Sequence, residues 1–553
     1  MQCQVGEEVG YSIRFEDVTS AKTKIRFLTD GMLLREALID PLLSRYAVVM
    51  IDEAHERSLN SDVLLGLLKK IKKKRPELRI IVSSATLQAG TFVDFFSEDD
   101  ESDSGCRVVS LEGRAYPVDV LYLETPTDDY VEKAVETAFN IHTQEADGDI
   151  LIFLTGREEI DRATQLLSEQ AAKLHPKAQA LQPLPLFAGL TTEEQMYVFE
   201  PAANNIRKVI LSTNIAEASV TIDGIVYVID TGFVKLRAYN PSSGIETLTP
   251  VPISKASAIQ RAGRAGRTKP GKCFRLYTEA SYHALAQTTI PEIQRSDLAP
   301  VVLQLKALGI DNIVRFNFLT PPPSSLVIRA LELLYSLGAV DDYAKLTKPL
   351  GTRMAELAVE PMMAKVLLSA PSFQCLSEVL SIAAMTSLQG SVWFHHEGEK
   401  KAMESSRRKF AVEEGDHLTL LNAYQAYVSK GRKDAKWCRD NHLNHKSMVR
   451  AVSIRTQLKR YLERLGVEVD ESLVSNGSRA SDVNKAEQIR KCLTAGYFAH
   501  AAKMMPDGTF KSVAGGVVLH AHPTSLMFVS DSILALLDHV KANLPRRTGK
   551  PSM

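Results

Sequence analysis

Short, continuous apolar runs alternate with longer amphipathic stretches through the first half of the chain. Runs of four or five residues bounded by polar turns predict buried strands of a parallel sheet, and the stretches between them predict helices. Such alternation is typical of an α/β fold, in which helices cover a mostly parallel sheet. The predicted strands are residues 47–51, 80–83, 150–154, 208–211 and 225–229, and the clearest helices are 61–74 and 130–142.

The pattern changes after about residue 280, where apolar positions recur at helical spacing. Helical segments then continue to about residue 465, and a polar linker is predicted at 470–484. Beyond it, short apolar runs predict strands of a small β-rich domain, and an amphipathic helix follows. The predicted helices are 298–308, 325–337, 365–380 and 532–543, and the predicted strands are 515–522 and 525–529.

Composition and charge exclude several classes of protein. With 553 residues the chain should hold several domains. The net charge is zero, so a nucleic acid would need a local basic groove. The six cysteines are widely spaced and predict neither a zinc site nor a disulfide framework. We find no apolar run of about 18 residues and no secretory signal, so we expect a nuclear or cytoplasmic protein without a membrane span.

The tetrapeptide Asp52-Glu53-Ala54-His55 directly follows the predicted strand at 47–51. An acidic pair at the end of a buried strand can hold Mg²⁺ and orient an attacking water in a nucleotide hydrolase. A strand that simply ends in a polar turn has the same pattern. The choice between these interpretations therefore depends on motifs elsewhere in the chain.

Three downstream motifs favour the nucleotide hydrolase. Ser84-Ala85-Thr86 follows the next predicted strand, where hydroxyl groups can hydrogen-bond the acidic motif. Arg264 and Arg267 are three residues apart, so we expect them on one helix face, where two guanidinium groups suit a transferring phosphate. The segment Thr213–Ser219 follows the predicted strand 208–211, at the edge where α/β sheets bind ligands. Its polar residues could also serve only as a helix cap.

In this order and spacing the motifs resemble the DEAH-box RNA helicases of the second helicase superfamily. The resemblance runs from Val9 to about Pro523 and includes Thr29-Asp30-Gly31, Leu154-Thr155-Gly156-Arg157 and Gln294-Arg295-Ser296-Asp297. It implies an ATP-dependent helicase that couples hydrolysis to translocation on, and unwinding or remodelling of, RNA or RNA–protein complexes. ATP and Mg²⁺ would be the cofactors. Partners would be RNA and a glycine-rich activator protein, or splicing or ribosome-assembly proteins, in the nucleus.

The resemblance also implies a role for individual residues. Asp52 would hold Mg²⁺ through water, Glu53 would position the hydrolytic water, and His55 would couple this site to a second domain. The γ-phosphate would meet Gln260, Arg264 and Arg267. The nucleotide-binding set would be Ser84, Thr86, Phe199, Ser219 and Asp223, with Phe199 stacked on the base and Ser219 sensing the nucleotide state. The RNA backbone would touch Thr29, Thr155, Gly156 and Thr213, and a β-hairpin at 234–257 would act as a wedge.

The implied architecture is a multidomain α/β protein with two RecA-like parallel-sheet domains and three accessory domains. The first RecA-like domain would occupy 1–112, incompletely, and the second, with the hairpin, 113–280. A winged helix would follow at 281–350, a ratchet-like helical bundle at 351–470, and an oligonucleotide-binding (OB-like) β domain with a divergent C-terminus at 471–553.

A glycine-rich loop with Lys and Ser/Thr usually holds the phosphates, and this sequence has none ahead of Asp52. The resemblance places that loop upstream of the present first residue. We therefore expect an incomplete first domain with exposed strand edges, and very weak or absent ATP hydrolysis by these 553 residues alone. The near match Gly266–Cys273 ends in Cys instead of a hydroxyl residue, and we interpret it as a turn. The alternative function is a non-catalytic isoform that binds RNA or a partner.

Overall fold

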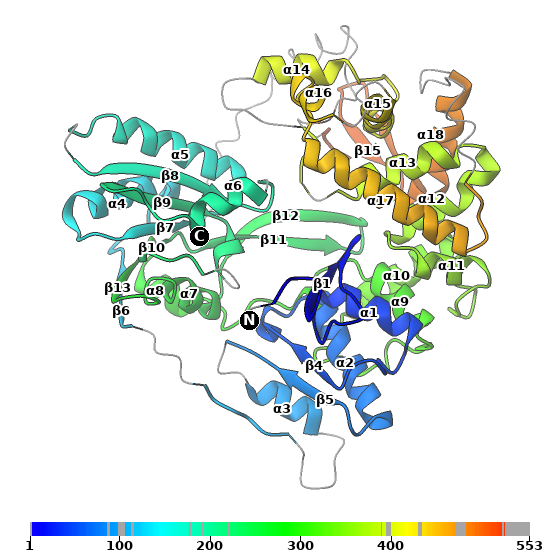
Figure 1. Ribbon diagram of the computed structural model, residues 1–553, viewed down its shortest axis with the longest axis horizontal. Coiled ribbons are helices and arrows are strands. Elements are labelled where there is room, and N and C mark those ends of the chain that lie inside the picture. Colours follow the sequence, from blue (N-terminus) through cyan, green and yellow to red (C-terminus); the bar gives the residue numbers. More distant parts are fainter. Residues whose placement is uncertain are drawn as a thin grey trace.

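Figure 1 shows the computed structural model of the chain, with an N-terminal α/β unit, a second α/β unit and a largely helical half. The structure describes residues 3–85, 89–97, 106–111, 116–175, 178–190, 192–217, 221–388, 390–393, 400–429, 434–469, 483–521 and 525. Among these residues no helix has the length and apolar character needed to cross a membrane.

The N-terminal unit contains two small sheets. Strands β1 (Val9–Ile13), β2 (Glu16–Val18) and β3 (Ile25–Leu28) form one in the order β2-β1-β3. Strands β4 (Val48–Ile51) and β5 (Arg79–Val82) pair in parallel, as the apolar runs predict. The helices of this unit are α1 (Asp30–Ile39), α2 (Leu59–Lys74) and α3 (Ala89–Ser97).

Strands β4 and β5 are not buried on both faces, which corrects the sequence-based prediction. Val49 and Ile51 are buried, but Val48 is 50% and Met50 is 55% exposed. Buried and exposed residues alternate along β4 because α2 and its neighbours cover one face of the sheet, and no described element covers the other. The described part of this sheet has two strands.

The second α/β unit is a six-stranded parallel sheet in the order β6-β13-β10-β7-β9-β8. Helices cover both faces, so the central strands alternate between two buried clusters and read as continuous apolar runs. The strands are β6 (Val118–Tyr122), β7 (Asp149–Phe153), β8 (Ala180–Leu186), β9 (Ile206–Ser212), β10 (Ile225–Asp230) and β13 (Gly271–Arg275). The helices are α4 (Tyr130–Gln144), α5 (Arg157–Ala171), α6 (Thr192–Met196), α7 (Lys255–Ala262) and α8 (Glu279–Ala284).

A β-hairpin leaves the end of β10, at the place that the sequence predicts. Its strands β11 (Phe233–Asn240) and β12 (Ile245–Pro252) are antiparallel over their whole length. The last residues of the predicted hairpin belong instead to α7, which begins after the capping residue Ser254. In Figure 1 the hairpin crosses from the second α/β unit toward α9 and α10 of the helical half.

The rest of the described chain is mainly helical and ends in three short antiparallel strands. The predicted helix at 365–380 is two helices, because Pro371 and a left-handed Gln374 (φ 53°) interrupt it. The helices are α9 (Ala299–Ala307), α10 (Ser324–Ser336), α11 (Leu350–Glu356), α12 (Pro361–Ser369), α13 (Leu376–Thr386), α14 (Lys400–Arg408), α15 (Asp416–Ser429), α16 (Ala435–Asp440), α17 (His445–Arg464) and α18 (Val483–Tyr497). The strands are β14 (Ala502–Met504), β15 (Phe510–Ser512) and β16 (Val518–Leu519).

Some predicted elements lie outside the described residues. These are the helix at 532–543, most of the strand at 525–529, and most of the linker at 470–484, whose last residues belong to α18.

The N-terminal unit and the helical half share one hydrophobic core. Its buried members run from Leu33 in α1 to Leu493 in α18. Polar contacts reinforce the junction: Arg14 Nη2 donates to Ala358 O at 2.6 Å, and Gln457 Nε2 donates to Phe15 O at 2.7 Å. The acidic motif is therefore mounted on a unit that the helical half holds in place.

Candidate nucleotide cleft and RNA-facing edge

The acidic motif occupies a tight turn at the carboxyl end of β4. Glu53 (φ 51°) and Arg57 (φ 52°) both adopt left-handed conformations on either side of the short helix η1 (Ala54–Glu56). Such conformations are uncommon for residues other than glycine, so the surroundings must hold the turn. Arg57 does so through Asp62, with its Nε and Nη2 at 2.7 and 2.9 Å from the two carboxylate oxygens. The turn leaves Asp52 exposed and the Glu53 side chain 32% exposed at the sheet edge.

His55 connects the acidic motif to the Ser-Ala-Thr motif after β5. Its Nδ1 accepts a hydrogen bond from the main-chain N–H of Ala85 at 3.2 Å. Burial lowers the pKa of His55 and outweighs the opposite influence of Glu53, Asp52 and Glu217. The imidazole is therefore neutral and carries its proton on Nε2, a buried atom without a hydrogen-bond partner among the described residues. Ser84 lies at this junction, and Thr86 lies outside the described residues.

The arginine motif does not have the predicted geometry. Helix α7 ends at Ala262, and turns follow in which Arg264 N bonds to Arg261 O at 3.1 Å. Arg264 and Arg267 therefore lie beyond the helix and share no helix face, so that prediction is wrong. The tight path requires glycine, because a Cβ on Gly266 would lie 2.5 Å from Tyr116 O on the segment leading into β6. Gln260 remains on α7 and is half-buried.

The turns place both arginines beside the segment that follows β9. Arg264 Nη2 donates to Glu217 O, and Arg267 Nη1 donates to Thr221 Oγ1. Burial lowers the pKa of Arg264 to about 10, and Arg267 adds to this lowering, while Glu53 and Glu217 act against it. At neutral pH Arg264 thus remains a cation in a partly desolvated place.

Charges from the two α/β units face each other across this cleft. Glu53 of the first unit acts on Arg264 of the second, and Glu217 of the second acts on His55 of the first. The acidic turn therefore supplies carboxylates from the first unit, and the second unit supplies the partly desolvated guanidinium of Arg264 together with the Glu217 carboxylate, which Arg261 and Ser257 hold. A triphosphate with a divalent cation fits this arrangement, because the cation meets the acids and the phosphate meets the arginine.

A magnesium ion also fits the donor set. In the part of the chain that the structure describes, no three His, Cys, Asp or Glu residues gather as a metal site of their own. Mg²⁺ commonly binds through one or two carboxylates together with substrate phosphates. The exposed Asp52 would supply the carboxylate, and the nucleotide would supply the other charged ligands.

The remaining predicted nucleotide residues are not brought together by the described contacts. Asp223 is exposed in the turn before β10. Phe199 is 39% exposed at the end of the short helix η2 (Tyr197–Phe199). Ser219 lies outside the described residues. Their roles stay predictions.

Three of the four predicted RNA-binding residues lie together at the carboxyl edge of the six-stranded sheet. Thr155 and Gly156 follow β7, and Thr213 follows the neighbouring strand β9, to which Leu154 N is bonded through Ser212 O at 2.8 Å. The fourth, Thr29, precedes α1 in the N-terminal unit. Thr29 and this edge therefore come from different units.

The structure adds Lys235 of β11 to this edge. A Cβ built on Gly156 would lie 2.8 Å from Lys235 Nζ, so the ammonium group sits directly against the glycine backbone. An ammonium group beside the start of α5 is well placed for an anionic phosphate. Sequence reasoning missed this residue because one lysine in a hairpin strand carries no distinguishing pattern.

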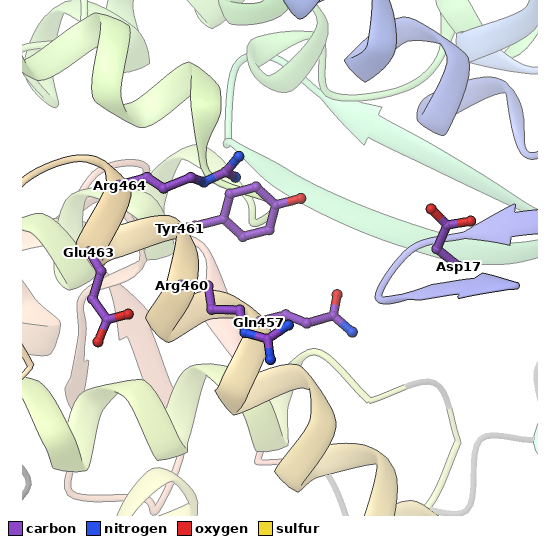
Figure 2. Close-up of a pocket in the computed structure, with 6 residues that line it drawn as sticks. All are labelled: Asp17, Gln457, Arg460, Tyr461, Glu463 and Arg464. Atoms are coloured by element: carbon purple, nitrogen blue, oxygen red, sulfur yellow. The ribbon is translucent and has the colours of Figure 1, made fainter. Parts of the chain in front are cut away.

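A separate surface pocket of about 870 Å³ lies between β2 and α17. Figure 2 shows Gln457 and Arg460 of α17 on the side that faces the strand of Asp17. Acidic and basic side chains line this pocket in equal number. None of the predicted site residues is among them, so the pocket is distinct from the cleft. Its lining residues are Asp17, Gln457, Arg460, Tyr461, Glu463 and Arg464.

Comparison with known proteins agrees with this geometry. The model of the helicase conserved C-terminal domain matches residues 131–269. The models of the helicase associated domain (HA2) match residues 330–359 as its winged-helix part and 360–420 as its ratchet-like part.

Curated relatives match along almost the whole chain. The probable ATP-dependent RNA helicase DHX35 of Homo sapiens is 50% identical over 530 residues, which are 95% of this chain and 74% of the relative. Its homolog in Caenorhabditis elegans is 47% identical over 533 residues, which are 96% of this chain and 71% of that protein. With the acidic turn and the arginine motif facing each other across one cleft, this similarity shows that the chain belongs to the DEAH-box family of RNA helicases.

Proposed function

We propose that the cleft between the two α/β units is the ATP site of an RNA helicase that uses hydrolysis to move along RNA and to unwind or remodel it, with very weak or absent hydrolysis expected of these 553 residues alone. One observation carries the proposal: Glu53 and Arg264, 211 residues apart in the sequence, lie close enough that the Glu53 carboxylate raises the pKa of Arg264 against the lowering by burial. A hydrolase that closes and opens two units around a nucleotide needs this kind of cross-cleft pair.

The residues of the cleft then have distinct roles. Asp52 would hold Mg²⁺, and Glu53 would orient the water that attacks the γ-phosphate. Gln260, Arg264 and Arg267 meet the phosphate from the second unit. Because burial has already removed part of the water around Arg264, its charge acts strongly on a developing negative charge. Magnesium, when bound, supplies charge neutralisation at the phosphates.

The coupling of the acidic motif to the second unit is the role proposed for His55, Ser84 and Thr86. Support for this role comes from the buried Nε2 proton of His55, which has no described partner and lies where Glu217 influences the ring. Phe199, Ser219 and Asp223 would complete the nucleotide site from the second unit.

RNA binds along the edge formed by Thr155, Gly156 and Thr213, with Lys235 as an additional phosphate contact and Thr29 from the first unit. Contacts of this kind are to the backbone, so they position the strand without reading its sequence. The β11–β12 hairpin lies next to this edge, which supports its role as a wedge at a duplex junction.

Steady-state ATP hydrolysis with and without single-stranded RNA tests the proposal, measured in a protein that carries these residues together with any segment encoded upstream. Glu53→Gln should lower kcat by about 10²–10⁴-fold while ATP still binds, because the water loses its orienting carboxylate. The matched control is Glu77→Gln, which removes a carboxylate whose side chain is 66% exposed at the far end of α2. Equal rates in Glu53→Gln and Glu77→Gln would refute the assigned role.

The same assay decides between hydrolysis and the alternative of RNA or partner binding alone. It compares these 553 residues with a protein that also carries any segment encoded upstream. RNA binding without RNA-stimulated turnover in both proteins would favour the binding function. Turnover in either one, lost in Glu53→Gln, would favour the enzyme.

The cellular setting is proposed from the family resemblance. We propose that the protein acts in the nucleus, in splicing or ribosome assembly, with a glycine-rich activator protein. Imaging of a tagged protein tests the location, and crosslinked RNA recovered from cells tests the substrate.

A further inference from the structure

One arginine of the Gln-Arg-Ala-Gly-Arg-Ala-Gly-Arg motif lies inside the protein. The Arg261 side chain is fully buried. Its Nε donates to Glu217 Oε2 at 2.9 Å, its Nη1 to Asp230 Oδ1 at 2.8 Å, and its Nη2 to Phe233 O at 3.1 Å. The guanidinium also lies 4.8 Å from the ring centre of Phe153. Arg261 thus reaches two carboxylates and one carbonyl in different directions.

On the cleft side, Arg261 and Arg264 share Glu217. The main-chain oxygen of Glu217 accepts from Arg264, and its carboxylate accepts from Arg261 and Ser257. A displacement of Arg264 that moves this segment therefore also moves the carboxylate that Arg261 holds.

On the other side, Arg261 holds the start of the hairpin. Asp230 ends β10, and Phe233 begins β11. The carboxylate of Asp230 also accepts from Gly232 N at 3.0 Å and from Tyr277 Oη at 2.8 Å. Because the Asp230 side chain is fully buried, water cannot replace Arg261 as its partner.

The far part of the hairpin is fixed to the segment that leads into the helical half. Tyr239 N donates to Arg295 O at 2.7 Å, and Arg295 Nη1 donates to Arg237 O at 2.8 Å. In Figure 1 the hairpin spans the distance between these two parts of the molecule. A movement at its base must therefore either bend the hairpin or be carried to the helical half.

We infer that Arg261 is a positioning residue that links the nucleotide cleft to the β11–β12 hairpin, so that the hairpin follows the state of Arg264. The inference rests on the proposed function of the cleft. Arginine is required because its planar fork makes directed bonds to Glu217 and Asp230 at once, which the single ammonium group of lysine cannot do. Breaking the bond to Asp230 would leave that buried carboxylate with only the neutral donors Gly232 N and Tyr277 Oη, so Arg261 and Asp230 move together.

Arg261→Lys tests the link in a protein that carries these residues together with any segment encoded upstream, with base pairs opened per ATP hydrolysed as the readout. We expect this ratio to fall by about tenfold, while ATP hydrolysis without RNA stays within about threefold of wild type. Asp230→Asn breaks the same link on the hairpin side and should lower the ratio similarly. Tyr277→Phe is the matched control, because it removes another bond to Asp230 and leaves Arg261 in place. An unchanged ratio, or equal losses of hydrolysis and unwinding, would overturn the link.

Hydrogen exchange of the folded wild-type protein tests the link without any substitution. Addition of a non-hydrolysable ATP analogue should change the exchange of amides at 232–239 in the absence of RNA, and Arg261→Lys should abolish this change. No change in the wild-type protein would overturn the inference. If the analogue alters these amides but no RNA-stimulated hydrolysis occurs, the link stands and the proposed function fails.

Discussion

Helix α2 meets the helical half at Gly66, where no side chain fits. A Cβ on this residue would lie 2.3 Å from Asn317 O and 2.7 Å from a ring carbon of Phe316. An ordinary contact needs roughly 3.4 Å or more, so α2 or the main chain at 317 would have to move by about 1 Å. Because a backbone oxygen cannot rotate aside, Gly66→Ala should be strongly unfavourable.

The size of the effect follows from two opposing contributions. Overpacking of this kind costs about 1–3 kcal/mol, and the upper end applies to a backbone neighbour. Alanine is favoured over glycine inside a helix by about 1 kcal/mol. The free energy of unfolding should therefore fall by about 2 kcal/mol in Gly66→Ala.

Gly90 in α3 supplies the matched control, because a Cβ there has no neighbour within 4 Å. Gly90→Ala should raise the free energy of unfolding by up to about 1 kcal/mol. The two variants then differ by about 3 kcal/mol, which amounts to about 6 °C or less in Tm, because the N-terminal unit and the helical half share one core and are together larger than the domains for which the shift is usually worked. Differential scanning calorimetry measures this difference. If Gly66→Ala melted at or above Gly90→Ala, the close packing of α2 on the helical half would be refuted.

Two further predictions concern His55 and Lys235. Burial lowers the pKa of His55 in the folded state, so the unfolded chain binds a proton at this ring more readily. The stability that the neutral ring contributes is therefore lost as the pH falls below about 6.5. In urea unfolding, the free energy of unfolding of the wild-type protein should fall between about pH 7.5 and about pH 5.5, and this fall should be smaller in His55→Gln. Equal falls in the two proteins would contradict the prediction. Lys235→Gln should weaken binding of single-stranded RNA and reduce the slope of log affinity against log salt by about 0.7. Lys24→Gln, at a lysine whose side chain is 79% exposed, should leave the slope unchanged, and an equal change in both would remove Lys235 from the RNA site.

The strands of the second α/β unit could be predicted from the sequence. Burial on both faces requires a continuous apolar run, and β7, β9 and β10 have such runs within one or two residues of their observed bounds. The same reasoning failed for β4 and β5, where alternate residues are exposed. An apolar run shows what a strand can bury, but the neighbouring elements decide which faces are covered.

The candidate site likewise has features that the sequence predicts and features that only the packing of the units sets. The sequence by itself determined which chemistry the chain carries: the acidic turn after one strand, the arginines near another, and the hydroxyl residues at strand ends. These follow from local order along the chain, because parallel strands bring their carboxyl ends to one edge. The family resemblance rests on the same local order.

Only the tertiary structure decided how the three arginines differ. They look equivalent in the sequence, yet Arg261 turns inward to Asp230 and Glu217, while Arg264 donates to the main-chain oxygen of Glu217 and lies where the Glu53 carboxylate raises its pKa. The helix that would have aligned them ends at Ala262, and beyond it Gly266 passes close to Tyr116, 150 positions away in the chain. Contacts between residues so far apart depend on how whole units pack, and no pattern of neighbouring residues encodes them.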